Sequence, residues 1–355
     1  MSPTLRTVRT RSLAVIAIAL VAVGAFTARA YYGASAASAS ANTVDAQRSL
    51  GQRLFNDVHL SADGSVSCAS CHQPSKQFSD DRPVSIGTGG LHGTRNAPSL
   101  LALGSSDEGA FFWDGRRADL KQAVMDPFTN PVEMGLPGKT VLQDRLRGDV
   151  HYQTAFAIAF PDHGTAITNA EISAALAAYV RSLNTETSPY DRYAGGHDAQ
   201  ALSPLAQLGL GLFKGKADCV ACHRLEGSPA PLTDHGYHRT GVGMESIATE
   251  LPVLTQGVID RSLKGYAVGD RVATHANEAQ LGRFNVTLNP ADIGMFRTPS
   301  LRHVAQTAPY MHDGSVPTLE EAIDREIYYR GLQNGRPLNL SVEERRALAA
   351  FLQSL

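Results

Sequence analysis

Two short stretches, Cys68-Ala-Ser-Cys71-His72 and Cys219-Val-Ala-Cys222-His223, decide how this chain of 355 residues is interpreted. Each stretch holds two cysteines separated by two residues, and a histidine follows the second cysteine directly. All four cysteines of the chain belong to these two stretches. The pattern is typical of covalent heme attachment in c-type cytochromes, because the two thiols reach the two vinyl groups of one porphyrin and the histidine can bind its iron.

Three other interpretations of the cysteine pairs are weaker. A redox dithiol of the thioredoxin type needs no following histidine and does not explain two copies. Zinc could take four cysteines, but the pairs lie about 150 residues apart, against roughly 12 to 20 in compact zinc modules. A disulfide across two intervening residues would be strained. The sequence therefore predicts two covalently bound heme c groups, with His72 and His223 as iron ligands.

The surroundings of the two motifs repeat. Leu50-Gly-Gln-Arg-Leu-Phe55 precedes the first motif, and Leu208-Gly-Leu-Gly-Leu-Phe213 precedes the second. Each half also ends on a helix that opens with a capping box, Thr168-Asn-Ala-Glu171 or Ser341-Val-Glu-Glu344. We expect these helices to bury apolar faces made by Ile172, Leu176, Tyr179 and Leu183, and by Leu348, Phe351, Leu352 and Leu355.

The repeat predicts a mainly α fold with two cytochrome c-like helical heme domains and long loops. The stretches Asp80 to Pro98 and Glu226 to Pro299 carry many Gly and Pro residues and are expected to be loops with a few short strands. The boundary between the domains is placed in the polar segment Asn184 to Ser203. The predicted division is a signal peptide at 1–30, a flexible lead-in at 31–44, an N-terminal domain at 45–200 and a C-terminal domain at 201–355.

The first thirty residues predict export. Arg6, Arg9 and Arg11 precede the apolar run Leu13 to Phe26, and Ala28-Arg29-Ala30 fits a cleavage site with small residues. A periplasmic protein is expected, and an uncleaved N-terminal anchor is the alternative. The formal net charge is only −2, without a long run of one sign, so nucleic acid is not expected as a partner.

Five further segments follow in a fixed order between and after the motifs. They are Gly93-Thr-Arg-Asn-Ala-Pro-Ser-Leu100, Phe111-Phe-Trp-Asp-Gly-Arg116, Asn130-Pro-Val-Glu-Met134, Phe296-Arg-Thr-Pro-Ser-Leu301 and Thr307-Ala-Pro-Tyr-Met-His-Asp-Gly314. From Leu50 to the C-terminus the chain resembles the bacterial di-heme cytochrome c peroxidase family, including its MauG-type branch. In that family the N-terminal heme is the peroxide site and the C-terminal heme receives or stores electrons.

The resemblance implies three catalytic residues. Trp113, the only tryptophan, matches the residue between the two rings, although by itself it would be interpreted as a core aromatic. Glu133 matches the distal carboxylate, which moves a proton between the oxygens of peroxide; alone, it would be interpreted as a solvated loop residue. Pro127, fourteen residues after Trp113, matches the proline on the open face. A glutamine common in the family is missing, because its position is Ala123 and Gln122 only adjoins it.

The resemblance also implies a calcium ion between the hemes. Its ligands match the side chain of Asn96 and the backbone carbonyls of Thr307 and Pro309. Oxygen ligands suit such a hard cation. Without the resemblance, Asn96 would be interpreted as a turn residue.

The axial ligands opposite the two histidines remain open. The family's loop histidine, which caps the first heme, corresponds to Thr88 here; His92 is either a displaced cap or an exposed loop histidine. For the second heme, counting fourteen residues from His312 leads to Glu326, whereas a two-residue insertion brings Tyr328 to the ligand position. Tyr328 is predicted because Tyr328-Tyr-Arg-Gly331 resembles the MauG-type ending, and Met311 is an alternative.

The predicted function is that of a di-heme peroxidase. It would reduce hydrogen peroxide with electrons from a small cytochrome c or copper protein. The first alternative is MauG-type oxidation of side chains in a partner protein. The second is a non-enzymatic di-heme electron carrier, which the long segments between the motifs disfavour.

Overall fold

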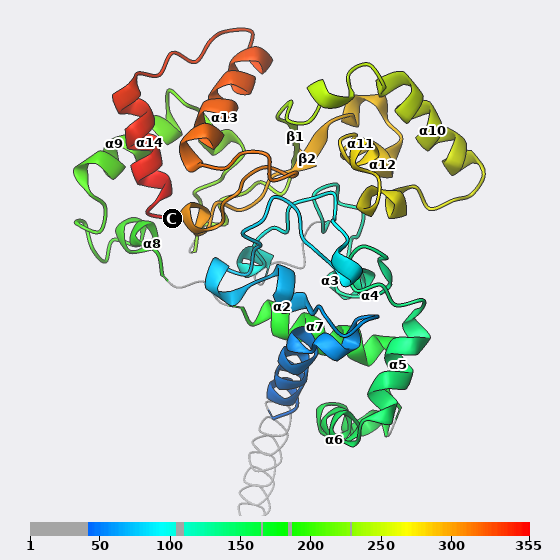
Figure 1. The fold of residues 1–355 in the computed structure, drawn as a ribbon. Helices are drawn as coiled ribbons and strands as arrows, with labels where there is room; N and C mark the ends of the chain where they lie inside the picture. The colour runs from blue at the N-terminus through cyan, green and yellow to red at the C-terminus, as the bar shows by residue number, and fades with distance from the viewer. Residues whose placement is uncertain (1–41, 104–109, 165, 184–186, 228) are drawn as a thin grey trace, which may run out of the picture.

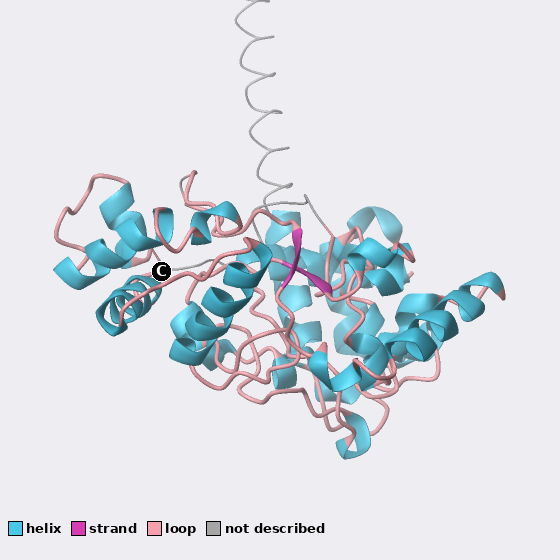
Figure 2. Cartoon of the chain, turned by 90° about the horizontal axis from the view of Figure 1, so that it is seen from above, coloured by secondary structure: helices cyan, strands magenta, loops and turns pink. Residues whose placement is uncertain are grey.

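The structure is a computed structural model that describes residues 42–355 apart from 104–109, 165, 184–186 and 228. Helices are its main regular structure, and two short strands lie among them (Figure 1, Figure 2). The prediction of a mainly α fold is therefore confirmed. None of the helices in the described ranges is long and apolar enough to span a membrane. The predicted signal peptide lies outside the described residues.

The first half of the chain begins with a helix over residues 42–56 and ends with the capped helix α7. Thr168 and Glu171 form the predicted capping box of α7, and its predicted apolar face is buried. Helix α7 covers Asn169–Arg181. Between the first helix and α7 lie α2 (Cys68–Cys71), α3 (Leu120–Ala123), α4 (Asp126–Thr129), α5 (Lys139–Gly148) and α6 (Val150–Ala159).

The second half ends in the same way, with Ser341 and Glu344 forming the predicted capping box of α14. Strands β1 (Tyr237–Arg239) and β2 (Met295–Arg297) pair antiparallel, with His238 opposite Phe296. The helices of this half are α8 (Pro189–Ala194), α9 (Pro204–Lys214), α10 (Leu251–Leu263), α11 (Ala276–Ala279), α12 (Phe284–Thr287), α13 (Leu319–Gln333) and α14 (Val342–Leu352).

Two expectations about irregular segments need correction. The stretch Glu226 to Pro299 is not mainly loop, since it contains α10, α11 and α12 around a small apolar cluster that includes Val258 and Phe284. The end of the predicted flexible lead-in also needs correction, because residues 42–44 already belong to the first helix; its residues 31–41 lie outside the described part of the chain. Two contacts stabilise this start of the helix: Ala46 packs against the core, and Asp45 forms an ion pair with Arg48 one turn later.

Both halves use the same helix crossing. Gly51 in the first helix lies against the Ala175 carbonyl of α7, and Gly209 in α9 lies against the Ala347 carbonyl of α14; a Cβ at either glycine would overlap that oxygen. The two crossings bring the helix before each heme motif against the capped helix that ends its half. Two separate apolar clusters result, one from residues between Leu50 and Leu183 and the other between Tyr190 and Leu355.

A second repeated element is a tight turn in each half. Phe112 and Met311 have φ of 68° and 71°, in the left-handed region. The N–H groups of Gly115 and Gly314 donate back to their carbonyls, at 3.1 and 3.2 Å. The strand-like bridges Phe111↔Arg117 and Tyr310↔Val316 enclose the two turns. Trp113-Asp114-Gly115 and His312-Asp313-Gly314 are thus equivalent in backbone conformation.

The glycine crossing predicts opposite effects for two substitutions in α9. Gly209→Ala should lower the free energy of unfolding by about 1–3 kcal/mol or more, because the new methyl group overlaps a backbone carbonyl. Gly211→Ala on the exposed side, where a Cβ meets nothing within 4 Å, should be neutral or stabilise by up to about 1 kcal/mol. Urea unfolding of the two variants measures the difference. Equal stabilities would show that α9 and α14 do not cross at Gly209.

Candidate functional site

One large cavity of about 500 Å³ reaches both heme motifs. It is bounded mainly by apolar atoms and by segments from both halves of the chain. Its lining includes all four cysteines together with His72 and His223. The two motifs, far apart in the sequence, therefore open into one shared space.

The cysteines are unpaired, which removes the disulfide interpretation. They also do not gather into a zinc site. Within the part of the chain that the structure describes, the one group of three potential ligands close enough for a metal is Cys222, Asp234 and His238. In that group His238 already pairs with Asp234 at 2.7 Å. The two cysteine pairs remain at separate positions along the cavity wall.

Each motif histidine is held in the same way. The Nδ1 atoms of His72 and His223 lie 3.0 and 2.9 Å from the carbonyl oxygens of Phe78 and Leu232. A carbonyl only accepts, so Nδ1 carries the proton and Nε2 keeps its lone pair for a metal. Burial lowers the pKa of His72 and lowers that of His223 to about 4, which keeps both rings neutral. Neutral imidazole is the form that binds iron.

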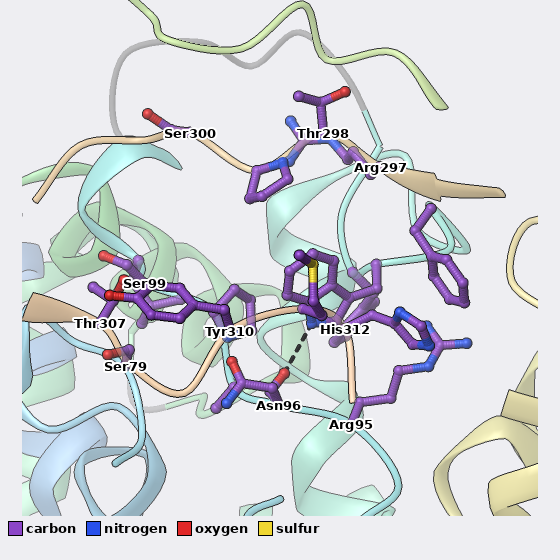
Figure 3. A pocket seen from close by; sticks show the side chains of 18 of the residues that line it. Ser79, Arg95, Asn96, Ser99, Arg297, Thr298, Ser300, Thr307, Tyr310 and His312 are labelled. Carbon is purple, nitrogen blue, oxygen red and sulfur yellow. Dashed lines mark hydrogen bonds between the residues drawn. The ribbon is translucent and has the colours of Figure 1, made fainter. Parts of the chain in front are cut away.

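Partly buried arginines make the cavity suitable for an anionic cofactor. Arg95, Arg116 and Arg297 all contribute to its lining, and Figure 3 shows Arg95 and Arg297 beside it. The Nε atoms of Arg95 and Arg297 are buried and have no hydrogen-bond partner in the described protein. A heme carries two carboxylates, which would satisfy such donors. The residues present therefore fit two hemes, with a histidine and a cysteine pair for each.

Trp113 connects the two halves at the cavity. Its Nε1–H donates to the Asn96 carbonyl at 2.8 Å, and its own carbonyl accepts from the Arg297 N–H at 2.7 Å. The Asn96 N–H in turn donates to the His312 carbonyl at 2.9 Å. Trp113 is thus fixed between segments of both halves, on the shared wall.

Glu133 and Pro127 both line the cavity, as expected for residues near the first motif. The Glu133 carbonyl accepts from the Thr88 N–H at 2.9 Å, which fixes the loop that carries the carboxylate. Burial raises the pKa of Glu133, despite the nearby positive charge of Arg116. A carboxyl group with a raised pKa holds a proton more readily and can pass it on. Of the two residues at the family's glutamine position, Ala123 lines the cavity and Gln122 does not.

The three predicted calcium ligands also meet the cavity. Asn96, Thr307 and Pro309 all line it. The Asn96 side-chain nitrogen donates to the carbonyls of Arg82 and Pro83, at 3.3 and 3.4 Å. No hydrogen bond from another described residue reaches the Asn96 side-chain oxygen or the two backbone carbonyls. Three oxygens are thus free to bind a cation.

Two of the residues considered as axial ligands lie outside the cavity. His92 is exposed and does not contribute to the cavity lining. Tyr328 is 61% exposed and also lies outside the cavity. Met311 and Glu326, the other two positions considered for the second heme, both line the cavity. Tyr328 therefore lies on the face of α13 that points away from the second motif, and the two-residue insertion assumed for Tyr328 is not supported.

The partly buried arginines were not among the residues selected from the sequence. A signal for them exists, since Arg95 and Arg297 each precede a Pro-Ser-Leu segment in the two halves. The pattern shows a repeat but not the cavity that both side chains reach. Spatial proximity was needed to find them.

Comparison with known proteins agrees with this geometry. Residues 45–199 match the family model described as di-haem cytochrome c peroxidase. The chain is 36% identical to the cytochrome-c peroxidase IdrP2 of Denitromonas iodatirespirans, over 86% of this chain and 80% of that protein. The chain belongs to the di-haem cytochrome c peroxidase family.

Other members of the family are similarly close. The methylamine utilization protein MauG of Methylorubrum extorquens is 34% identical, with 86% of this chain and 77% of MauG covered. The crystal structure of a MauG-like protein associated with microbial copper homeostasis is 34% identical, with a TM-score of 0.70 over 87% of this chain and 89% of that one. As a di-haem peroxidase, the chain is an oxidoreductase with two hemes that acts on peroxide and exchanges electrons with a redox or protein partner.

The arginines by the cavity depend on one buried carboxylate, Asp114. It lies 3.1 Å from Arg116 and 3.5 Å from Arg95 and is fully buried. Burial raises its pKa, but the charges of Arg116 and Arg95 outweigh this effect and hold the pKa below its ordinary value. The carboxylate is therefore charged at neutral pH and compensates both cations.

We expect Asp114→Asn to lower the free energy of unfolding by about 3–5 kcal/mol at neutral pH, because two buried cations lose their counter-charge. The difference from wild type should disappear as the pH falls through the lowered pKa of Asp114. Asp260→Asn on the surface of α10 is the control, with a change within about 0.5 kcal/mol. Urea unfolding checks both; equal stability of the two variants would contradict the role given to Asp114.

Proposed function

We propose that this chain is an exported, periplasmic di-heme peroxidase that reduces hydrogen peroxide with electrons from a small cytochrome c or copper protein. One observation carries the proposal: a single cavity joins both Cys-x-x-Cys-His motifs and also contains Trp113 and Glu133. A simple electron carrier has no use for a carboxylate with a raised pKa beside one of its two hemes. The export signal in residues 1–30 supports the periplasmic location.

In this proposal the chain forms two cytochrome c-like domains, at 45–200 and 201–355. Each holds one heme c through two thioether bonds and one histidine. The separate apolar clusters and the repeated glycine crossing support two domains. The repeated hydrogen bond from histidine to carbonyl supports equal attachment of both hemes. When bound, each heme iron supplies one-electron redox chemistry and, where its second face is free, a site for peroxide.

The residues around the first motif then have defined tasks. Pro127 offers no metal-binding group and leaves room for peroxide. Glu133 takes the proton from the inner peroxide oxygen and gives it to the outer one, which leaves as water. Trp113 lies between the halves and provides the path for electrons from the His223 side. The overall change is H₂O₂ + 2 H⁺ + 2 e⁻ → 2 H₂O, with the electrons coming from the partner protein.

A calcium ion is proposed between the halves. Its ligands would be the Asn96 side-chain oxygen and the backbone carbonyls of Thr307 and Pro309. The free acceptor oxygens described above support this assignment. Because Asn96 also accepts the Trp113 hydrogen bond through its carbonyl, the ion would hold the electron path in place.

MauG-type oxidation of a partner protein is the second candidate. The position of His92 favours it, because this histidine is exposed and lies away from the cavity. Without a histidine cap, the first heme would react with peroxide in the protein as isolated. A capped peroxidase would first need one-electron reduction.

Glu133→Gln keeps the size of the side chain but cannot carry the proton. We expect peroxide turnover with a reduced small cytochrome c to fall by roughly 10² to 10⁴-fold. The exposed Glu245→Gln serves as a control with wild-type rate. A rate within about twofold of wild type in Glu133→Gln would remove this residue from the proposed proton path.

The same assay, run before and after one-electron reduction, separates the two candidates. Peroxide-driven oxidation of the cytochrome that requires prior reduction would favour the capped peroxidase. Reaction of the untreated protein, with slow oxidation of the cytochrome, would favour the MauG-type activity.

A further inference from the structure

The two halves of the chain continue to correspond beyond their tight turns. After the first turn, Asp119 caps α3 by accepting from the Lys121 N–H; after the second, Thr318 caps α13 by accepting from the Glu321 N–H. The first helical residues, Leu120 and Leu319, are both buried and both line the cavity. The turn and the helix start are therefore matched in the two halves, residue for residue.

This correspondence assigns a partner to Pro127. Seven residues after Leu120 the chain reaches Pro127, and seven residues after Leu319 it reaches Glu326. Both residues line the cavity; Pro127 lies in α4, just after α3 ends at Ala123, whereas Glu326 lies within the continuous helix α13. The position that is a proline beside the first motif is thus a glutamate beside the second.

Helix α13 carries Glu326 to the second motif. Its cavity-lining residues follow the helical repeat and form one broad face: Leu319, Ala322, Ile323, Glu326, Ile327, Tyr329, Arg330 and Gln333. One turn after Glu326, Arg330 donates to the Asp218 carbonyl at 2.8 Å and to the Cys222 sulfur at 3.5 Å. Burial, and then the charge of Glu326, raise the pKa of Cys219, so the carboxylate lies near that thiol.

The side-chain carboxylate of Glu326 is also available to bind a ligand. Within the described ranges, no hydrogen bond or ion pair to its side chain is found, although it lies on a largely apolar wall. The neighbouring polar groups are engaged. Of the charged groups that act on Glu326, Arg330 pairs with Asp218 at 3.2 Å and His238 pairs with Asp234 at 2.7 Å.

The other two candidates fit this position less well. Met311 lies in the second turn and corresponds to Phe112, not to Pro127, in the repeat. Its neighbour His312 is bonded to Asn96 of the first half and to Gln280. Tyr328 points away from the cavity with 61% of its surface exposed. Glu326 alone combines the matched position with the wall of the second motif.

We propose that the carboxylate of Glu326 is the sixth ligand of the heme held by His223, while Pro127 leaves the corresponding face of the first heme open. The proposal rests on the two-heme assignment above and deepens it. The difference between Pro127 and Glu326 would then determine that the first heme binds peroxide and the second transfers electrons. A hard anionic oxygen ligand favours the ferric state, so the second heme would have a lower reduction potential than one bound by methionine.

The test compares Glu326→Gln with Glu320→Gln, an exposed glutamate in the first turn of α13. Electron paramagnetic resonance and resonance Raman spectra of the ferric holoprotein report the ligands of each iron, and redox titration gives the potentials. In Glu326→Gln we expect loss of the carboxylate-bound signal and a positive shift of one of the two potentials. Glu320→Gln and Tyr328→Phe should leave spectra and potentials unchanged.

A gain-of-signal variant covers the case in which Glu326→Gln does not take up heme. Glu326→His should convert the second heme to a low-spin form with two histidine ligands, because the new ring would take the place of the carboxylate on the cavity wall. Absence of this signal in protein with two hemes would overturn the proposal. An unchanged spectrum of Glu326→Gln, or a ligand change in Tyr328→Phe or Met311→Leu instead, would also overturn it.

The heme content separates this proposal from the one on which it rests. Two hemes per wild-type chain, counted from the pyridine hemochrome spectrum, support the two-heme assignment whatever ligand is found at position 326. Fewer than two hemes in the wild type would contradict that assignment itself.

Discussion

The hydrogen bond from each motif histidine to a backbone carbonyl is the interaction on which the site depends. It fixes the proton on Nδ1, aims Nε2 into the cavity and is made twice, to Phe78 and to Leu232. Both carbonyls belong to residues held at φ of 56° and 55°, so the backbone itself is shaped to receive the ring. The helix crossings at Gly51 and Gly209 bring the rest of each half around this bond.

Two similar halves do not by themselves produce an enzyme. The two halves differ at two places on the cavity wall. Glu133 lies beside the first motif, and the position that is Pro127 in the first half is Glu326, a carboxylate, in the second. Trp113, bonded to Asn96 of its own half and to Arg297 of the other, connects the two environments. Asp114 compensates the charges of Arg95 and Arg116, two arginines of the first half on the shared wall.

The sequence predicts the local features well. The capping boxes at Thr168 and Ser341 depend on residues three apart, so they could be identified from the chain alone. Helix α10 was missed because Val258 is its only buried residue, which leaves little apolar periodicity. Trp113, Glu133 and Asn96 line one cavity, in line with the family resemblance. Tyr328 does not, because the packing of α13 decides which of its residues face the cavity, and a local sequence pattern does not contain that information. The pairing of Arg95 with Asp114 depends on distant segments and has no local signal.

The central claim is that two equally attached hemes share one cavity and differ in their open face. Titration of the ferric holoprotein with azide, followed by its visible spectrum, tests this claim most directly. We predict saturation at a single azide per chain, with half of the heme absorbance unchanged, because Pro127 leaves one iron accessible and Glu326 closes the other. Binding of two azides, or of none both before and after one-electron reduction, would contradict the claim.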